Sequence, residues 1–122
     1  MIPDHLFTSA SRLRIDVDET GDAIRLTLVG ELDSDEAPKL SDAVTQAVRS
    51  HPGRPIGLDA GDLEFLDSGG LRALIESRQE AEAAGSRLTV VAVSTVVFQV
   101  LEITGLLSIF EVPRPGAGRQ PA

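Results

Sequence analysis

A chain of 122 residues with a formal net charge of −8 is long enough for one compact domain and too short for two ordinary ones. Its 19 acidic and 11 basic residues give it a charge that repels phosphate backbones and anionic lipid headgroups, so neither nucleic acid nor a membrane is an expected partner. The absence of cysteine excludes disulfides, thiolate metal sites and cysteine nucleophiles. We see no signal-peptide pattern and no apolar run of roughly eighteen residues, and we therefore expect a cytoplasmic protein.

The two ends of the chain differ in composition from its middle. Residues 1–12 are polar and follow no apolar pattern, and residues 113–122 are rich in proline and glycine. Such segments bury too little apolar surface to pack stably. We therefore expect a flexible leader and a flexible Pro/Gly-rich tail on either side of a single domain over residues 13–112.

The domain is predicted to begin with a β-hairpin. Apolar and charged residues alternate over residues 13–17, and a similar alternation returns over residues 24–28 after the turn sequence Thr-Gly-Asp. From Ser34 the apolar spacing becomes that of a helix, in which Pro38 is tolerated only in the first turn. The sequence Ser-His-Pro-Gly at residues 50–53 ends this first helix.

Strands and helices alternate over the rest of the domain. The predicted elements are a short buried strand at 56–59 with an extended run up to Asp67, a second helix with Leu71, Leu74, Ile75 and Arg78 on one face and Gly85 as its stop, a strand buried on both faces at 86–93, a third helix at 94–105 capped by Ser94 or Thr95, and a short last strand at 107–112. This alternation predicts right-handed crossovers between parallel strands. The expected fold is α/β, with a mixed, mostly parallel sheet of four to five strands covered by about three helices.

A Leu-Asp-Ser sequence occurs twice, at residues 32–34 and 66–68, each time where a predicted strand gives way to a helix. In parallel α/β sheets, ligands and partners meet the carboxyl ends of the strands. We therefore expect Asp33 and Asp67 to lie near one another at such an edge.

The second copy continues into two glycines, and its serine allows two interpretations. In the first, Ser68 caps the second helix and its hydroxyl accepts a hydrogen bond from a backbone amide, which is worth about 1 kcal/mol. The second starts from Gly69 and Gly70, because each glycine inside a helix costs roughly 1 kcal/mol relative to alanine, while the missing side chains leave the hydroxyl accessible to another protein's active site. A phosphate placed there would meet the positive end of the helix dipole and add about −1.5 to −2 charges beside Asp67, so that Ser68 would act as a binding switch.

Other site chemistries fit the sequence less well. His5 lies in the leader and His51 in a Pro/Gly loop, so neither is placed to activate Ser68 or to bind a metal, and no G-x-S-x-G elbow is present. The nucleotide-binding patterns G-x-x-x-x-G-K-[ST] and G-x-G-x-x-G are also absent. Asp33 and Asp67 could form an acid–base pair, but aspartates at strand ends are usually caps or turn formers. We expect no catalysis, no metal and no cofactor, and a kinase that acts in trans.

Three stretches, LTLVGELDSDEAPKLSDAVTQAV, DLEFLDSGGLRAL and ITGLLSIF, follow one another as in the STAS domains of bacterial anti-sigma factor antagonists. The sequence closely resembles this family over about residues 13–112. The resemblance implies a partner-switching regulator, in which the unphosphorylated antagonist binds an anti-sigma factor that is itself a serine kinase and so frees a sigma factor. The kinase would then phosphorylate the antagonist and release it, and a PP2C-type phosphatase would restore it.

The resemblance also implies the site residues. Ser68 matches the phosphorylated serine, and Asp33 and Asp67 match the aspartates that flank it and help to engage the kinase. The expected docking surface comprises Asp33, Ser34, Asp67, Gly69, Gly70 and Leu71. Ser34 is the weakest member, because Asp35 and Glu36 beside it repel an incoming phosphoryl donor.

The sequence departs from the family in two places. Gly69 stands where many relatives have a second Ser or Thr, which leaves one acceptor. After Val112 the chain becomes Pro/Gly-rich where the family usually has a further helix on the sheet, so a homodimer or a loosely packed face is expected there. A second function stays open at this point, namely a STAS structural subunit of a membrane-associated lipid transporter or of a larger signalling scaffold.

Overall fold

The computed structural model describes residues 11–117, and this part of the chain contains four strands and three helices. They are, in order, β1 (Leu13–Asp18), β2 (Ile24–Leu32), α1 (Ala37–Ser50), β3 (Ile56–Leu66), α2 (Ser68–Ala83), β4 (Leu88–Val93) and α3 (Thr95–Ile103). The strands form one sheet in the order β1-β2-β3-β4, in which β1 and β2 are antiparallel and the other two pairs are parallel. The predicted α/β fold, with a mixed sheet and an N-terminal hairpin, is confirmed.

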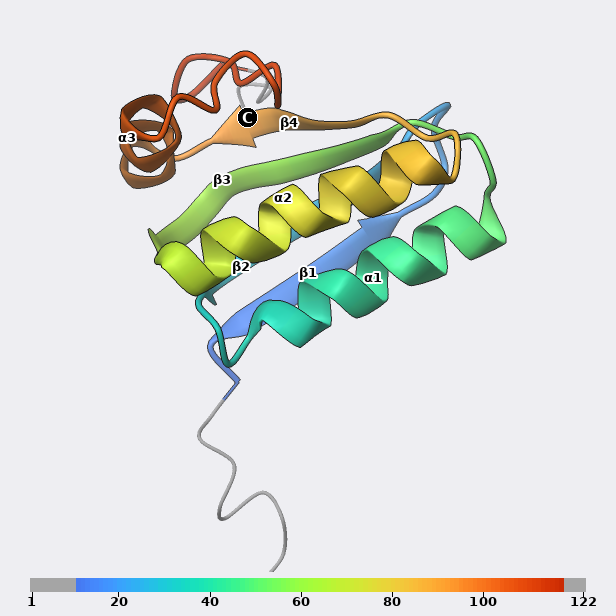
Figure 1. Ribbon diagram of the computed structural model, residues 1–122, viewed down its shortest axis with the longest axis horizontal. Coiled ribbons are helices and arrows are strands. Elements are labelled where there is room, and N and C mark those ends of the chain that lie inside the picture. The colour runs from blue at the N-terminus through green and yellow to red at the C-terminus, as the bar shows by residue number, and fades with distance from the viewer. Residues whose placement is uncertain (1–10, 118–122) are drawn as a thin grey trace, which may run out of the picture.

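The apolar core lies between the sheet and the helices α1 and α2, which lie side by side across one face of the sheet (Figure 1). Alternate residues of β2 point into it, and Ile24, Leu26 and Leu28 are fully buried. From α1 the core receives Leu40 and Val44, one turn apart on the same face. The aliphatic residues recur at the strand period and the helix period on facing surfaces, which is why these elements pack as the sequence predicts.

Local signals in the sequence set the ends of the helices. Pro38 lies at the start of α1, as expected. α2 ends at Ala83, and Gly85 follows with a φ of 80°, a left-handed conformation that favours glycine. The Ser94 hydroxyl accepts a hydrogen bond from the Val97 amide at 3.2 Å and caps α3, which decides between the two predicted caps.

The third strand is longer than predicted. A short strand at 56–59 followed by a separate extended run was expected, but β3 continues as one strand through Leu66. Asp59 interrupts the apolar run in the sequence, and in the fold its carboxylate pairs with Arg25 of β2 at 2.7 Å. Because this partner comes from the neighbouring strand, the polar residue does not end β3.

The segment after α3 is not the strand that was predicted at residues 107–112. It forms turns, and Glu111 has a φ of 53°, which is incompatible with a strand. One backbone contact with the sheet remains, in which the Val90 amide donates to the Phe110 carbonyl at 2.8 Å. The Phe110 side chain is fully buried, so this segment covers the outer edge of β4 as an irregular chain (Figure 1).

β4 is therefore the edge strand of the sheet. Leu88 and Val90 are buried and Thr89 and Val91 are half-buried, whereas Ala92 and Val93 at the end of the strand are both buried. Because adjacent residues of a strand point to opposite faces, the prediction that this strand is buried on both faces holds only at Ala92 and Val93.

The predicted leader and tail fall largely outside the described residues, which do not include 1–10 and 118–122. Arg12, the last residue of the predicted leader, is held in place, since its amide donates to the Glu36 carboxylate at 2.8 Å. In the tail, a turn joins Arg114 and Ala117. No helix within residues 11–117 combines the length and the apolar character that crossing a membrane requires.

Candidate phosphorylation and docking site

Ser68 is the first residue of α2, and its side chain is exposed. The preceding residue caps the helix, because Asp67 Oδ1 accepts a hydrogen bond from the Gly70 amide at 2.9 Å. The interpretation of Ser68 as the N-cap is therefore wrong, since the carboxylate one residue earlier takes that role. The Ser68 hydroxyl has no hydrogen-bond partner within residues 11–117 and is left free for chemistry.

The two glycines after Ser68 are required by close packing. A Cβ at Gly70 would lie 2.1 Å from the Leu32 carbonyl oxygen, and a Cβ at Gly69 would lie 2.6 Å from the Ser34 Cβ. Both distances are far below the roughly 3.5–4.0 Å at which non-bonded carbon atoms pack. The glycines therefore let α2 approach the end of β2, which is a stronger requirement than the access to the hydroxyl that the sequence suggested.

Asp33 and Asp67 lie at the same edge of the sheet. The register pairs Leu32 of β2 with Leu66 of β3, and the Asp67 amide approaches the Leu32 carbonyl at 3.5 Å. Neighbouring strands are about 4.8 Å apart, so the two aspartates, which follow directly, are neighbours as the repeated Leu-Asp-Ser sequence predicts. The start of α2 and the loop into α1 meet at this edge (Figure 1).

The Asp33 carboxylate is held by two partners. Its Oδ2 forms an ion pair with the Arg12 guanidinium at 2.5 Å, and its Oδ1 accepts from the Glu36 amide at 2.9 Å. The hydrogen bond from Arg12, followed by that from Glu36, lowers the pKa of Asp33 below its ordinary value. Asp33 is therefore a fixed, ionised carboxylate at the edge of the candidate docking surface.

Glu36 is a structural residue that the sequence analysis treated only as a repelling charge. It is 7% exposed, and its Oε1 accepts from the amides of Arg12 and Leu13 at 2.8 and 2.9 Å and from Lys39 Nζ at 3.0 Å. Burial opposes ionisation, but the hydrogen bonds from Lys39 and from the two amides outweigh it, and the pKa of Glu36 is lowered. In the sequence, the spacing of Asp33 and Glu36 signals the start of a helix. It does not show that Glu36 binds Arg12 and Leu13, which lie far from it along the chain.

The remaining predicted site residues differ in exposure. Ser34 is exposed and lies against the Gly69 backbone, whereas Gly70 is buried and Leu71 is half-buried against the core. A groove of about 440 Å³ runs between the first turns of α1 and α2, and Ser34, Gly69 and Arg72 are among the residues that line it. Arg72 was not predicted as a site residue, although its spacing from the serine is visible in the sequence.

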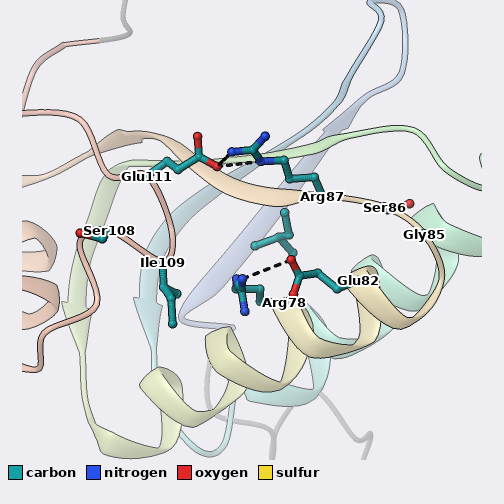
Figure 2. Close-up of a pocket in the computed structure, with 9 residues that line it drawn as sticks. Arg78, Glu82, Gly85, Ser86, Arg87, Ser108, Ile109 and Glu111 are labelled. Atoms are coloured by element: carbon teal, nitrogen blue, oxygen red, sulfur yellow. Dashed lines mark hydrogen bonds and ion pairs between the residues drawn. The ribbon is translucent and has the colours of Figure 1, made fainter.

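A second hollow, of about 600 Å³, lies at the far end of α2 beside residues 108–111 (Figure 2). Its charged side chains neutralise one another, because Arg78 pairs with Glu82 at 3.1 Å and Arg87 pairs with Glu111. A ligand that entered the hollow would therefore meet charged side chains that are already paired with one another. In residues 11–117, no group of three or more His, Asp or Glu side chains is arranged to hold a metal ion.

Comparisons with known proteins identify the family. A family model described as "Mlab, STAS domain" matches residues 15–111, and the chain belongs to the STAS domain family. The anti-sigma-B factor antagonist of Listeria monocytogenes is 29% identical over 91 residues, which cover 75% of this chain and 79% of that protein. The protein of the same name from Listeria innocua matches with the same identity and coverage. The resemblance on which the sequence analysis relied is confirmed.

Solved structures show the same fold. An anti-sigma factor antagonist from Mycobacterium paratuberculosis superposes with a TM-score of 0.72 at 24% identity, covering 89% of this chain and 92% of that chain. The phosphorylated form of SpoIIAA, a Bacillus cell fate determinant, superposes with a TM-score of 0.63 at 20% identity, covering 82% of this chain and 89% of that chain.

Proposed function

We propose that this STAS domain is an anti-sigma factor antagonist that acts in the cytoplasm and has no catalysis of its own. The unphosphorylated chain binds an anti-sigma factor serine kinase and so frees a sigma factor, and phosphorylation of Ser68 releases the kinase. The observation that carries the proposal is the accessible Ser68 hydroxyl at the first position of α2, which the Asp67 cap leaves unoccupied. The names of the Listeria relatives support the same class of protein.

A phosphate on Ser68 is compatible with the folded helix. The first amides of a helix have no intrahelical acceptor, and those of Ser68 and Gly69 have none elsewhere in residues 11–117. They lie at the positive end of the α2 dipole, where an anion is stabilised. Phosphorylation therefore changes the surface of α2 without unfolding it.

The same phosphate opposes docking. It adds about −1.5 to −2 charges beside Asp67 and near the ionised Asp33. A partner surface that fits the unmodified face must then either remove water from the phosphate or place its own groups against this negative charge. Each 1.4 kcal/mol of binding free energy lost in this way reduces the affinity about tenfold. The modification thus acts as a release signal.

The six docking residues divide by exposure into two roles. Asp33, Ser34, Asp67 and Gly69 are exposed or half-buried, and we assign them direct contact with the kinase. Gly70 and Leu71 support the surface from below, because one is buried against the end of β2 and the other packs on the core.

A PP2C-type phosphatase completes the cycle by removing the phosphate. No metal or cofactor is assigned to the chain itself. The alternative, a STAS structural subunit of a lipid transporter or of a larger scaffold, is not favoured by the curated relatives, which are named anti-sigma-B factor antagonists.

Intact mass spectrometry tests the switch directly. The full chain is incubated with ATP and purified candidate anti-sigma factor kinases, and one phosphoryl group is expected to be added. The addition should vanish in Ser68→Ala and persist in Ser108→Ala, a control because Ser108 is an exposed serine outside the docking surface.

Partner capture provides the second arm of the test. The wild-type chain should retain an anti-sigma factor kinase, and Ser68→Asp should retain at least tenfold less of it. Phosphorylation that survives in Ser68→Ala, or capture of a transporter ATPase in place of the kinase, would overturn the proposal.

A further inference from the structure

Arg72 is a cation without a partner on the surface that carries Ser68. It is exposed on α2, and no carboxylate of residues 11–117 lies within 4.0 Å of its guanidinium. The other cations near this edge are paired, since Arg12 binds Asp33 and Lys39 binds Glu36. In a chain with a net charge of −8, a cation left unpaired beside a candidate modification site calls for an explanation.

The helix places Arg72 within reach of Ser68. The two residues are four apart on α2, a spacing that puts their Cβ atoms about 5–6 Å from each other on one helix face. Long side chains on a helix lean towards its N-terminus, which is the direction from Arg72 to the turn that contains Ser68. Arg72 also lines the groove between α1 and α2, to which Gly69 of the first turn of α2 contributes as well.

We propose that the Arg72 guanidinium binds the phosphate of phosphorylated Ser68 and directs it towards the groove between α1 and α2. This inference rests on the proposed modification of Ser68. An acidic group four residues before a basic one is the favourable order on a helix, and a planar guanidinium can bind two phosphate oxygens at once.

Two carboxylates lie in the same groove as Arg72 without pairing with it. Glu76, one turn further along α2, and Asp42 of α1 line the same groove, but neither lies within 4.0 Å of the guanidinium. A phosphate carries more charge than a carboxylate and offers three acceptor oxygens, so Arg72 binds the phosphate in preference to either carboxylate.

The pairing gives phosphorylation a second effect on docking. Before modification, Arg72 is free to meet an acidic group of the partner. After modification, it is engaged by the phosphate of its own helix. The switch then both adds a negative charge and withdraws a positive one from the same surface.

A phosphorus NMR titration of the full chain tests the pairing without any kinase. Phosphoserine is inserted at position 68 during translation with a suppressor tRNA, and the second ionisation of the phosphate is followed from pH 4 to pH 8. One positive charge about 5 Å away, in a water-like dielectric, lowers that pKa by about half a unit. We expect the pKa in Arg72→Gln to be higher than in the wild type by this amount, with Arg72→Lys in between.

Arg78→Gln is the matched control, because it removes the same charge from the same helix ten residues from Ser68, or about 15 Å along the axis. Circular dichroism of the unphosphorylated variants verifies that each is folded. Equal pKa values in the wild type and Arg72→Gln, or an equal shift in Arg78→Gln, would overturn the pairing. The phosphate is installed without a kinase. A failed kinase assay on Ser68 would therefore contradict the proposed function without affecting this measurement.

Discussion

Replacing Gly70 with alanine has two opposing effects on stability, one within the helix and one between the helix and the sheet. Within a helix, alanine is more favourable than glycine by about 1 kcal/mol, so helix propensity alone predicts a more stable chain. The added Cβ, however, would lie 2.1 Å from the Leu32 carbonyl oxygen and 2.8 Å from its carbon. Both atoms belong to the backbone of the sheet and cannot rotate away as a side chain would.

The size of the net effect follows from these two terms. Overpacking costs typically 1–3 kcal/mol, and the upper end applies here because the contact is with backbone. After the gain of about 1 kcal/mol in helix propensity, we expect Gly70→Ala to be about 2 kcal/mol less stable than the wild type. For a chain of this length that corresponds to a Tm lower by roughly 8 °C.

Urea unfolding followed by circular dichroism measures the difference. Gln79→Gly, at an exposed position in the interior of α2, calibrates the helix term and should lose about 1 kcal/mol. If Gly70→Ala is at least as stable as the wild type while Gln79→Gly loses the expected amount, close approach to β2 is not what requires the glycine. Access to the Ser68 hydroxyl would then be the better explanation.

Two further predictions concern the same edge of the sheet. Asp67→Ala should lose about 1 kcal/mol of unfolding free energy because the N-cap is removed, whereas Ser68→Ala should stay within about 0.5 kcal/mol, and urea unfolding that gave the two variants equal losses would contradict the assigned cap. The lowered pKa of Asp33 means that its ionisation stabilises the fold above the unfolded value of about 4 and that this contribution is lost as the pH falls through the folded value. The difference in unfolding free energy between the wild type and Arg12→Gln, measured by urea unfolding, should therefore become smaller between pH 7 and pH 3. Arg14→Gln is the exposed control, and its difference from the wild type should change little. If the Arg12→Gln difference stayed equally constant, the Arg12–Asp33 ion pair would not be stabilising the fold.

Much of the fold can be predicted from patterns within a few residues. The alternation over residues 13–17 and 24–28 marks the hairpin because successive side chains of a strand point to opposite faces. Helix ends are equally local, as Gly85 and Ser94 show, since a cap or a left-handed turn depends on a few adjacent residues. The prediction of a strand at 107–112 was wrong because the backbone of Glu111 adopts a positive φ, which its residue type does not signal.

The candidate site is only partly a matter of local pattern. The repeated Leu-Asp-Ser sequence, together with the expectation of parallel strands, correctly makes Asp33 and Asp67 neighbours. The cap could not be assigned in this way, because Asp67 and Ser68 are both good N-cap residues and the choice depends on where the helix begins. If α2 began one residue later, Ser68 would be the N-cap and its hydroxyl would accept a backbone hydrogen bond. Because α2 begins at Ser68, the hydroxyl is free.

The sequence by itself determined the order of strands and helices as far as α3, the aliphatic core and the edge at which the serine lies, because each of these follows from spacing along the chain. Only the tertiary structure decided why Gly69 and Gly70 are glycines and why Arg12 belongs to the site. Those answers depend on contacts between residues far apart in sequence, such as the carbonyl of Leu32 against α2 and the guanidinium of Arg12 against Asp33. Such contacts exist only once β1, β2 and β3 lie in register, and no periodicity within one segment encodes them.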